Sequence, residues 1–177
     1  ANTATIDIAN FNSSLMSAVS GLGTLNKAGT GTLSLNGTNT FVGSLNVQAG
    51  KVAINNANSL GANNNSVSLA DNTSLITSAA VTAQQAIVIA ENGKVTLDSM
   101  DKDSSLNGVI SGTNATISKA GSGTLSLNGT NTFVGSLNVQ SGKVAINNAN
   151  SLGVNSNSVS LADNTSLSTT AAVTAQQ

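Results

Sequence analysis

The sequence predicts an all-β protein, and within that class a parallel β-solenoid of about eight rungs. First, residues 27–85 and 119–177 are two copies of one 59-residue stretch at an offset of 92, and they differ at six positions. Second, short segments alternate apolar and polar residues. Third, apolar positions recur at a nearly constant spacing through both copies. Neighbouring units of such an array bury each other's apolar faces, which favours a structural or display protein.

The predicted strands are the alternating segments, because apolar residues at i and i+2 face one side of a strand. In chain order they are residues 32–35, 44–47, 51–54, 66–69, 87–89, 94–97 and 115–117. Turn signals separate them at residues 36–37, 49–50, 63–65 and 92–93. The six differences between the copies are Thr30/Ser122, Ala49/Ser141, Ala62/Val154, Asn64/Ser156, Ile76/Ser168 and Ser78/Thr170.

The spacing of the apolar positions distinguishes a solenoid from an antiparallel sandwich. One series runs through Leu33, Ile54, Leu75, Leu97 and Ile117, and a second through Val47, Leu69, Ile89 and Val109. Both advance by 20 to 22 residues per step, which gives about four rungs per 92-residue unit. A sandwich also has short alternating strands, but it has no reason to keep this register across both copies.

The inward positions should form one continuous core. The residues assigned to it are Leu35, Val47, Ile54, Leu69, Leu97, Leu127, Val139, Ile146 and Leu161. We expect Phe41 and Phe133 to fill the same core at equivalent rungs rather than to bind a ligand. The whole chain, residues 1–177, is expected to be a single solenoid made of two units of about 92 residues.

The composition excludes several function classes. Charged residues are 7% of the chain, the net charge is -1, and Pro, Cys, His, Trp, Tyr and Arg do not occur. The low charge gives no bulk attraction for nucleic acid or anionic membrane, and no apolar run is long enough to span a bilayer. Without His, Cys or Arg, no Ser-His-Asp triad, thiolate or His/Cys zinc site can form. We therefore predict no enzyme activity, no cofactor and no catalytic, cofactor-binding or metal site.

Two motifs still invite a functional reading. Asp98, Asp101 and Asp103 surround Lys102, but the first unit has Asp7, Asn10 and Asn12 at these places, so a solvated turn is preferred to a weak cation site. The Gly-rich segments 29–31 and 121–123 could suggest a phosphate loop. No Gly-Lys-Ser/Thr follows them, so we interpret them as tight turns.

Polar motifs are also abundant. Asn-x-Ser/Thr triplets begin at Asn12, Asn36, Asn72, Asn114, Asn128 and Asn164, and in so Asn-rich a chain we attribute them to chance rather than to glycosylation. Thr38-Asn39-Thr40 could belong to an ice-binding Thr array, but it does not recur at every rung.

The segment from Lys27 to Gly43, Lys-Ala-Gly-Thr-Gly-Thr-Leu-Ser-Leu-Asn-Gly-Thr-Asn-Thr-Phe-Val-Gly, resembles the passenger-associated transport repeat, also called the autotransporter-associated β-strand repeat. Residues 119–135 match equally well, as do Gly50-Lys51-Val52 and residues 58–61 with their counterparts. Leu45 and Leu137 depart from the family, which more often has Thr there. The resemblance implies a right-handed parallel β-helix in the secreted passenger of a Gram-negative type V system. It also implies that these repeats promote outward transport by folding at the cell surface and are not the catalytic part.

Two functions remain open from the sequence. The first is a structural, secretion-promoting, adhesive or fibre-forming stalk that is secreted or at the cell surface. The second is the scaffold fragment of a β-helix enzyme or toxin whose active module lies elsewhere. The expected partners are neighbouring repeats, with head-to-tail self-association through uncapped ends, and a host or cell-surface receptor. We expect no nucleic-acid binding and no membrane insertion by this segment.

Overall fold

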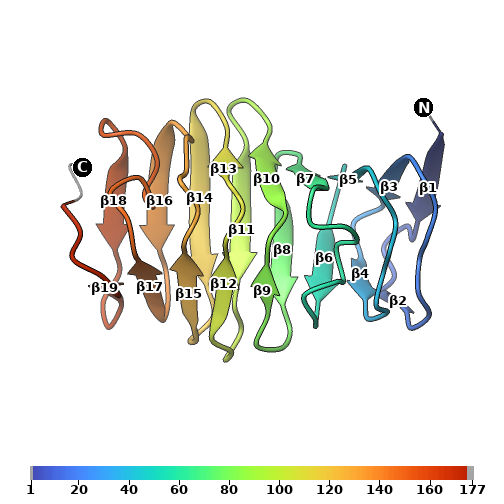
Figure 1. Cartoon of the computed structure of the whole chain (residues 1–177), viewed down its shortest axis with the longest axis horizontal. Coiled ribbons are helices and arrows are strands. Elements are labelled where there is room, and N and C mark those ends of the chain that lie inside the picture. The colour runs from blue at the N-terminus through green and yellow to red at the C-terminus, as the bar shows by residue number, and fades with distance from the viewer. Residues whose placement is uncertain (1, 175–177) are drawn as a thin grey trace.

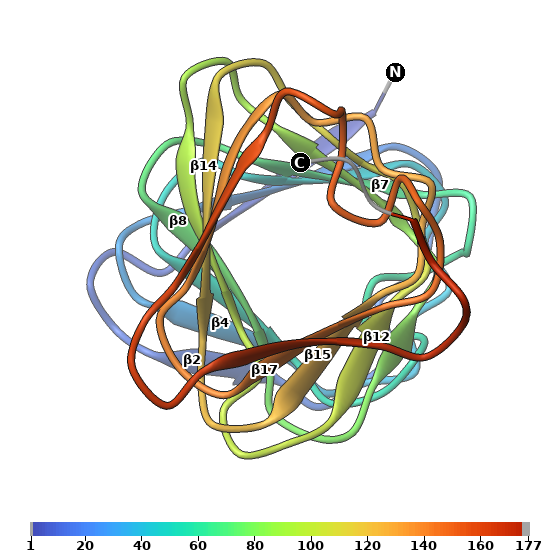
Figure 2. The same cartoon turned by 90° about the vertical axis from the view of Figure 1, so that its left-hand side faces the viewer.

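The chain winds into a three-sided prism whose walls are parallel sheets (Figures 1 and 2). The computed structural model describes residues 2–174. Every pair of strands in the described chain is parallel. The predicted solenoid of about eight turns is therefore confirmed, and the sandwich alternative is wrong.

The three sheets divide the strands as follows. The first sheet contains β1 (Thr3–Asp7), β3 (Thr24–Ala28), β5 (Ser44–Val47), β7 (Ser66–Leu69), β10 (Ala86–Ile89) and β13 (Ile110–Ser111). The second contains β2 (Ser13–Leu15), β4 (Thr32–Leu35), β6 (Lys51–Ile54), β8 (Thr73–Thr77), β11 (Lys94–Asp98), β14 (Ala115–Ala120), β16 (Gly135–Val139) and β18 (Ser158–Leu161). The third contains β9 (Thr82–Ala83), β12 (Ser104–Leu106), β15 (Thr124–Leu127), β17 (Lys143–Ile146) and β19 (Ser166–Thr169).

The solenoid is right-handed. Figure 2 views the prism from its C-terminal end, and the chain passes counterclockwise from the first sheet to the second and then to the third as it approaches the viewer. This is the hand that right-twisted strands favour in parallel crossovers. The handedness implied by the family resemblance is therefore confirmed.

Side-chain alternation builds the core. In the second sheet, Leu33 pairs with Val52, Val52 with Leu75 and Leu75 with Leu97, so apolar side chains stack along the axis. Stacked strands lie about 4.8 Å apart, and burying one such leucine contributes roughly 1.5–3 kcal/mol. Eight of the nine predicted core residues are buried, and so are Phe41 and Phe133.

One predicted core residue is not buried, and one predicted inward position is wrong. Leu161 is 49% exposed, because β18 is the last strand of its sheet and no further described turn covers it. Val109 is 40% exposed, whereas its neighbour Ile110 is fully buried and pairs with Ile87. A slip of one residue moves a side chain to the opposite face of a strand, and the apolar pair Val109-Ile110 does not reveal which residue faces inward.

The 92-residue repeat does not equal a whole number of turns. Four turns of strand pairing carry Leu33 through Val52, Leu75 and Leu97 to Lys119, which is 86 residues further on. The sequence repeat instead carries Leu33 to Leu125, six residues beyond Lys119 and in the third sheet. One unit therefore spans four turns plus one strand, which refines the prediction of about four rungs.

As a result, the second copy is rotated about the solenoid axis by one of the three sides of the prism relative to the first copy. Strands β3 and β5 of the first copy lie in the first sheet, and their counterparts β14 and β16 lie in the second. Strands β4 and β6 lie in the second sheet, and their counterparts β15 and β17 lie in the third. The last three residues of the predicted 119–177 segment lie outside the described residues.

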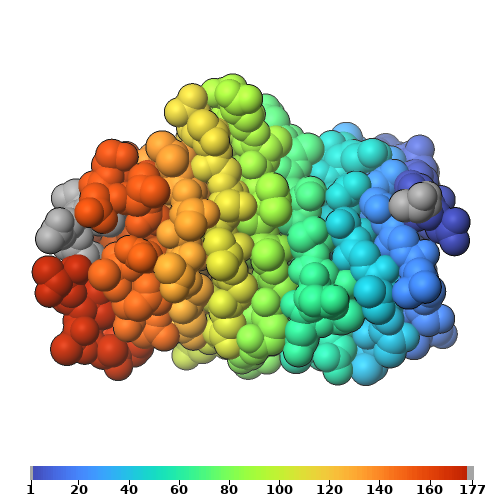
Figure 3. Space-filling model, turned by 45° about the horizontal axis from the view of Figure 1, so that its top comes forward, coloured from blue at the N-terminus to red at the C-terminus, as the bar shows by residue number. Residues whose placement is uncertain are grey.

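A crest rises on the face of the prism that Figure 3 shows. In Figure 3 the turns that join β10 to β11 and β13 to β14 rise above their neighbours. Within residues 2–174, no helix is long and apolar enough to cross a membrane.

Candidate functional sites

The acidic cluster of the sequence is dispersed over turn positions. Asp98 Oδ1 accepts a hydrogen bond from Met100 N at 2.7 Å, and Asp103 Oδ1 accepts one from Thr124 N at 2.8 Å. Asp101 pairs with Lys102 at 3.0 Å on the exposed surface. Among the described residues, no three His, Cys, Asp or Glu side chains lie close enough to hold a metal ion. The arrangement is that of solvated turns.

These carboxylates cap backbone amides, and uncharged residues do the same elsewhere. Asn12 Oδ1 accepts from Thr32 N at 2.9 Å, as Asp103 Oδ1 does from Thr124 N. Hydrogen bonds from Lys102 lower the pKa of Asp101, and hydrogen bonds from Thr124 lower that of Asp103. Because an amide serves the capping role as well, the missing carboxylates of the first unit are not evidence of a lost site.

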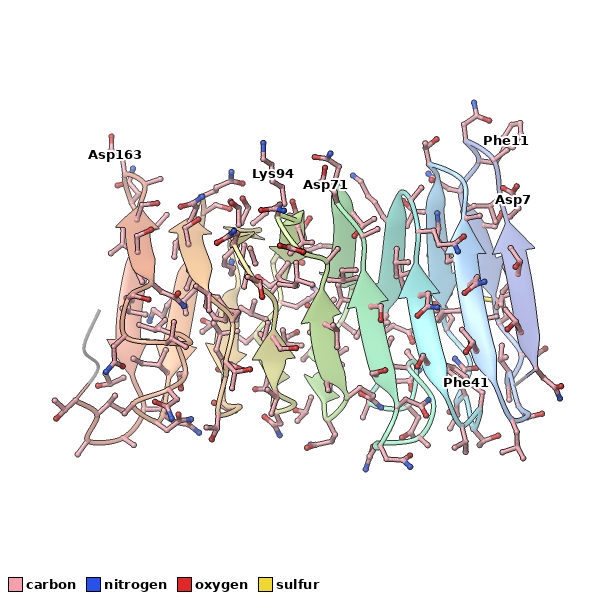
Figure 4. The ribbon with its side chains drawn as sticks, turned by 90° about the horizontal axis from the view of Figure 1, so that it is seen from above. Asp7, Phe11, Phe41, Asp71, Lys94 and Asp163 are labelled. Atoms are coloured by element: carbon pink, nitrogen blue, oxygen red, sulfur yellow. The ribbon has the colours of Figure 1, made fainter. Side chains whose placement is uncertain are left out.

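The same capping joins turns along one edge of the prism. Asp71 Oδ1 accepts a hydrogen bond from Lys94 N at 2.8 Å, which ties the turn after β7 to the start of β11. Figure 4 shows Asp7, Asp71 and Lys94 projecting from this edge, whereas Phe41 lies away from it. This row of charges is solvated and serves the turns.

The Gly-rich segments are close-packed turns, as expected, and no helix begins there. Gly29 has φ +78°, and a side chain on it would collide with the backbone of Ala9 in the preceding turn. Gly31 lies equally close to the backbone of Phe11. Glycine is needed because two turns of backbone approach each other here. Gly31 N donates to Ala9 O at 3.1 Å, so this amide is already engaged within the fold.

Two lysines that the sequence reading missed lie inside the prism. Lys27 and Lys119 are completely buried and sit at inward positions of β3 and β14. Lys27 Nζ donates to Gly29 O and to Ala49 O, the latter at 2.8 Å. Lys119 Nζ donates to the carbonyls of Ala120, Gly121 and Ser141, at 2.9, 2.6 and 3.0 Å. Each ammonium thus joins the turns of two successive rungs.

Burial changes the electrostatics of both lysines. It lowers the pKa of Lys27 and of Lys119, and the carboxylates of Asp7 and Asp98 partly oppose that shift. A charged group in an apolar interior must be paired or hydrogen-bonded, and here backbone carbonyls supply the partners. A signal was present in the sequence, since Leu25 and Lys27 occupy alternate positions and so share one face of the strand.

Buried asparagines form a second repeated device. Asn39 Oδ1 accepts from Val19 N at 2.8 Å, and its Nδ2 donates to Ser59 O at 2.6 Å, so one side chain joins three turns. Asn65 Nδ2 donates to Phe41 O and Leu60 O. Asn131 and Asn157 repeat these roles in the second copy. Asparagine suits this place because its amide both donates and accepts.

The glycosylation triplets and the Thr pair fall on turns and loops. Asn72, Asn114 and Asn164 adopt positive φ at turns, a conformation that asparagine tolerates. Thr38 and Thr40 are exposed on either side of the buried Asn39. The absence of a catalytic, metal or cofactor site stays a prediction.

Comparison with known proteins finds a family match in both repeated segments. A family model described as Passenger-associated-transport-repeat matches residues 25–54 and 117–146, the segments that run from β3 to β6 and from β14 to β17. The Adhesin BmaC autotransporter of Brucella suis biovar 1 (strain 1330) is 39% identical over 72 residues. That alignment spans 41% of this chain and only 2% of the relative's length. No solved structure matches. The resemblance found in the sequence is confirmed: two segments of the chain match the passenger-associated transport repeat.

Proposed function

We propose that this chain is a non-catalytic structural region of a surface-exposed or secreted passenger in a Gram-negative bacterium. The observation that carries the proposal is the pair of passenger repeats built into one uninterrupted ladder of parallel strands. Each turn can fold against the turn before it, because nearly all its backbone partners lie one turn away. Such stepwise stacking suits a chain that emerges progressively at a surface.

The proposal also assigns the chain a role other than enzyme catalysis. Within residues 2–174, the fully buried side-chain nitrogen and oxygen atoms other than Thr77 Oγ1 form hydrogen bonds, as those of Lys27 and Asn39 show. The sequence relative is named an adhesin, and adhesion or fibre formation by the protein that carries this chain is part of the proposal. The partners that a turn requires are the turns stacked on either side of it.

The test uses intact cells that express the whole protein to which this chain belongs. Added protease should cleave this region on intact cells, and a core variant, Leu127→Asp, should reduce the amount that reaches the surface. Its neighbour Ser126 faces outward, so Ser126→Asp is the matched control and should leave surface display unchanged. A region that resists protease on intact cells but is cleaved after lysis would contradict the proposal.

A further inference from the structure

A shallow hollow occurs in each copy at equivalent positions. The first is lined by Thr38, Asn39, Thr40, Asn58 and residues 61–63, with a volume of about 330 Å³. The second is lined by Asn131, Thr132, Asn150 and residues 153–156, with a volume of about 530 Å³. Both volumes lie in the range of roughly 300–1,000 Å³ that is typical of small-molecule sites.

The walls of each hollow are held rigidly. In the first, the buried Asn39 side chain bonds Val19 N at 2.8 Å and Ser59 O at 2.6 Å. In the second, Asn131 bonds Ile110 N and Ser151 O at the same two distances. These bonds fix a strand-like segment of one turn against the loop of the next. A site on such a frame loses little conformational entropy when a ligand binds.

The rim of each hollow offers unused polar groups. Thr38, Thr40, Asn58 and Asn63 are exposed, and within residues 2–174 their side chains form no hydrogen bond. Their counterparts in the second hollow include Thr132, Asn150 and Asn155. A hydroxyl and a carboxamide each both donate and accept, so the rim can match a ligand that carries both kinds of group.

The lining determines the class of ligand. No charged residue lines either hollow, which gives no advantage to an ion. The methyl groups of the Thr side chains and of Ala62 or Val154 supply small apolar contacts between the polar groups. Neutral saccharides combine hydroxyl groups with apolar C–H surface in this way. We propose that the two hollows are binding sites for a neutral saccharide, a function beyond the structural role above.

The two sites should act separately and need not be equal. The first lies on the side of the prism that corresponds to the third sheet, and the second on the side of the first sheet, because the repeat is offset by one strand. Two of the six differences between the copies, Ala62/Val154 and Asn64/Ser156, lie at or beside these hollows. Those differences should also give the two hollows separate amide signals in an NMR spectrum.

Amide chemical-shift titration of the isotope-labelled chain with maltotriose, cellotriose or N,N′,N″-triacetylchitotriose, all of them neutral, tests the proposal. At least one trisaccharide should shift the signals of both hollows, with a Kd on the order of 1 mM because the sites are shallow. The double variant Asn58→Ala/Asn63→Ala should weaken binding at the first hollow by about tenfold, equivalent to two lost hydrogen bonds. Binding at the second hollow should be unchanged, which also shows that the variant is folded.

Asn10→Ala is the matched control, because this exposed asparagine lies in a turn outside both hollows. Asn10→Ala should leave the titration unchanged. Thr40→Val removes a rim hydroxyl of the first hollow and should also weaken binding there. The proposal is overturned if none of the three sugars shifts the hollow signals at about ten times that Kd. It is equally overturned if shifts spread over exposed amides without preference, or if the double variant binds as the parent chain does.

Discussion

At the scale of single residues, the buried lysines show how this fold uses a charge without a buried counter-ion. Lys27 spans the corner between the first and second sheets, where its ammonium donates to the carbonyls of Gly29 and Ala49. No other hydrogen bond to these two carbonyl oxygens occurs within residues 2–174. An ammonium has three N–H donors, so it can hydrogen-bond to several carbonyl oxygens at once.

Replacement of that ammonium should therefore destabilise the solenoid. Lys27→Met keeps the length of the side chain but leaves two half-buried carbonyls without their ammonium partner. The expected cost is about 1–2 kcal/mol in the free energy of unfolding. Lys51→Met removes an exposed lysine from the neighbouring turn and should change stability by less than about 0.5 kcal/mol. Urea denaturation followed by circular dichroism measures both. Equal stabilities of the two variants would show that the buried ammonium contributes nothing.

The lowered pKa values also predict a pH dependence of stability. Above the lowered pKa of folded Lys27 and Lys119, and below the ordinary value of 10.5, the unfolded chain binds more protons than the folded one. The free energy of unfolding should therefore rise with pH through that window. The chain has no Cys, Tyr or Arg, so lysines dominate the titration at alkaline pH. This rise in the free energy of unfolding should disappear in the double variant Lys27→Met/Lys119→Met. A free energy of unfolding that falls with pH in the unsubstituted chain would contradict the prediction.

At the scale of strands, the alternation of apolar residues predicted two of the three walls. The series through Leu33 and Leu75 lies in the second sheet, and the series through Val47 and Leu69 in the first. The third wall was missed, because in the first copy its side of the prism is formed by irregular segments rich in Gly and Asn and by the two-residue strand β9. A steady spacing reveals the turn length, but it does not reveal how many corners each turn has.

The buried lysines and asparagines were less predictable from the sequence than the fold. Sequence reading treats Lys and Asn as surface residues, which is correct for most proteins. Here Lys27 and Asn39 face inward, and only pairing across turns shows what satisfies them. Bonds between residues about 20 positions apart are invisible until the register of the strands is known.

A strand-level test concerns the inward face of the third sheet. Leu127 is fully buried and pairs with Leu106 and Ile146. Leu127→Asp should lower the free energy of unfolding by several kcal/mol, about 3–5, because it buries an unpaired charge. Val139 is a poorer choice, since it pairs with Lys119 and a carboxylate there could meet the ammonium. Ser126→Asp is the control, and a Leu127→Asp protein as stable as this control would show that the inward face is misassigned.

At the scale of the whole molecule, the mismatch between repeat length and turn length sets how features are displayed. Each 92-residue unit advances by four turns and one of three sides, so equivalent features follow a path around the prism. A unit of four whole turns would place them in one row on one side. Identical sequence therefore meets solvent in two directions, which suits a stalk that contacts its surroundings on several sides.

Spin-label distances test this rotation directly. Ser34 and its repeat counterpart Ser126 face outward from the second and third sheets, whereas Ala120 lies four turns from Ser34 in the same row of the second sheet. Spin labels can be attached at chosen pairs of introduced cysteines, because the native chain has no cysteine. The Ser34→Cys/Ala120→Cys pair should give a backbone separation of about 19 Å, four times the strand spacing. The Ser34→Cys/Ser126→Cys pair should be clearly longer, because a corner of the prism separates its labels. Equal distances for the two pairs would mean that the repeat holds a whole number of turns and that both copies face the same way.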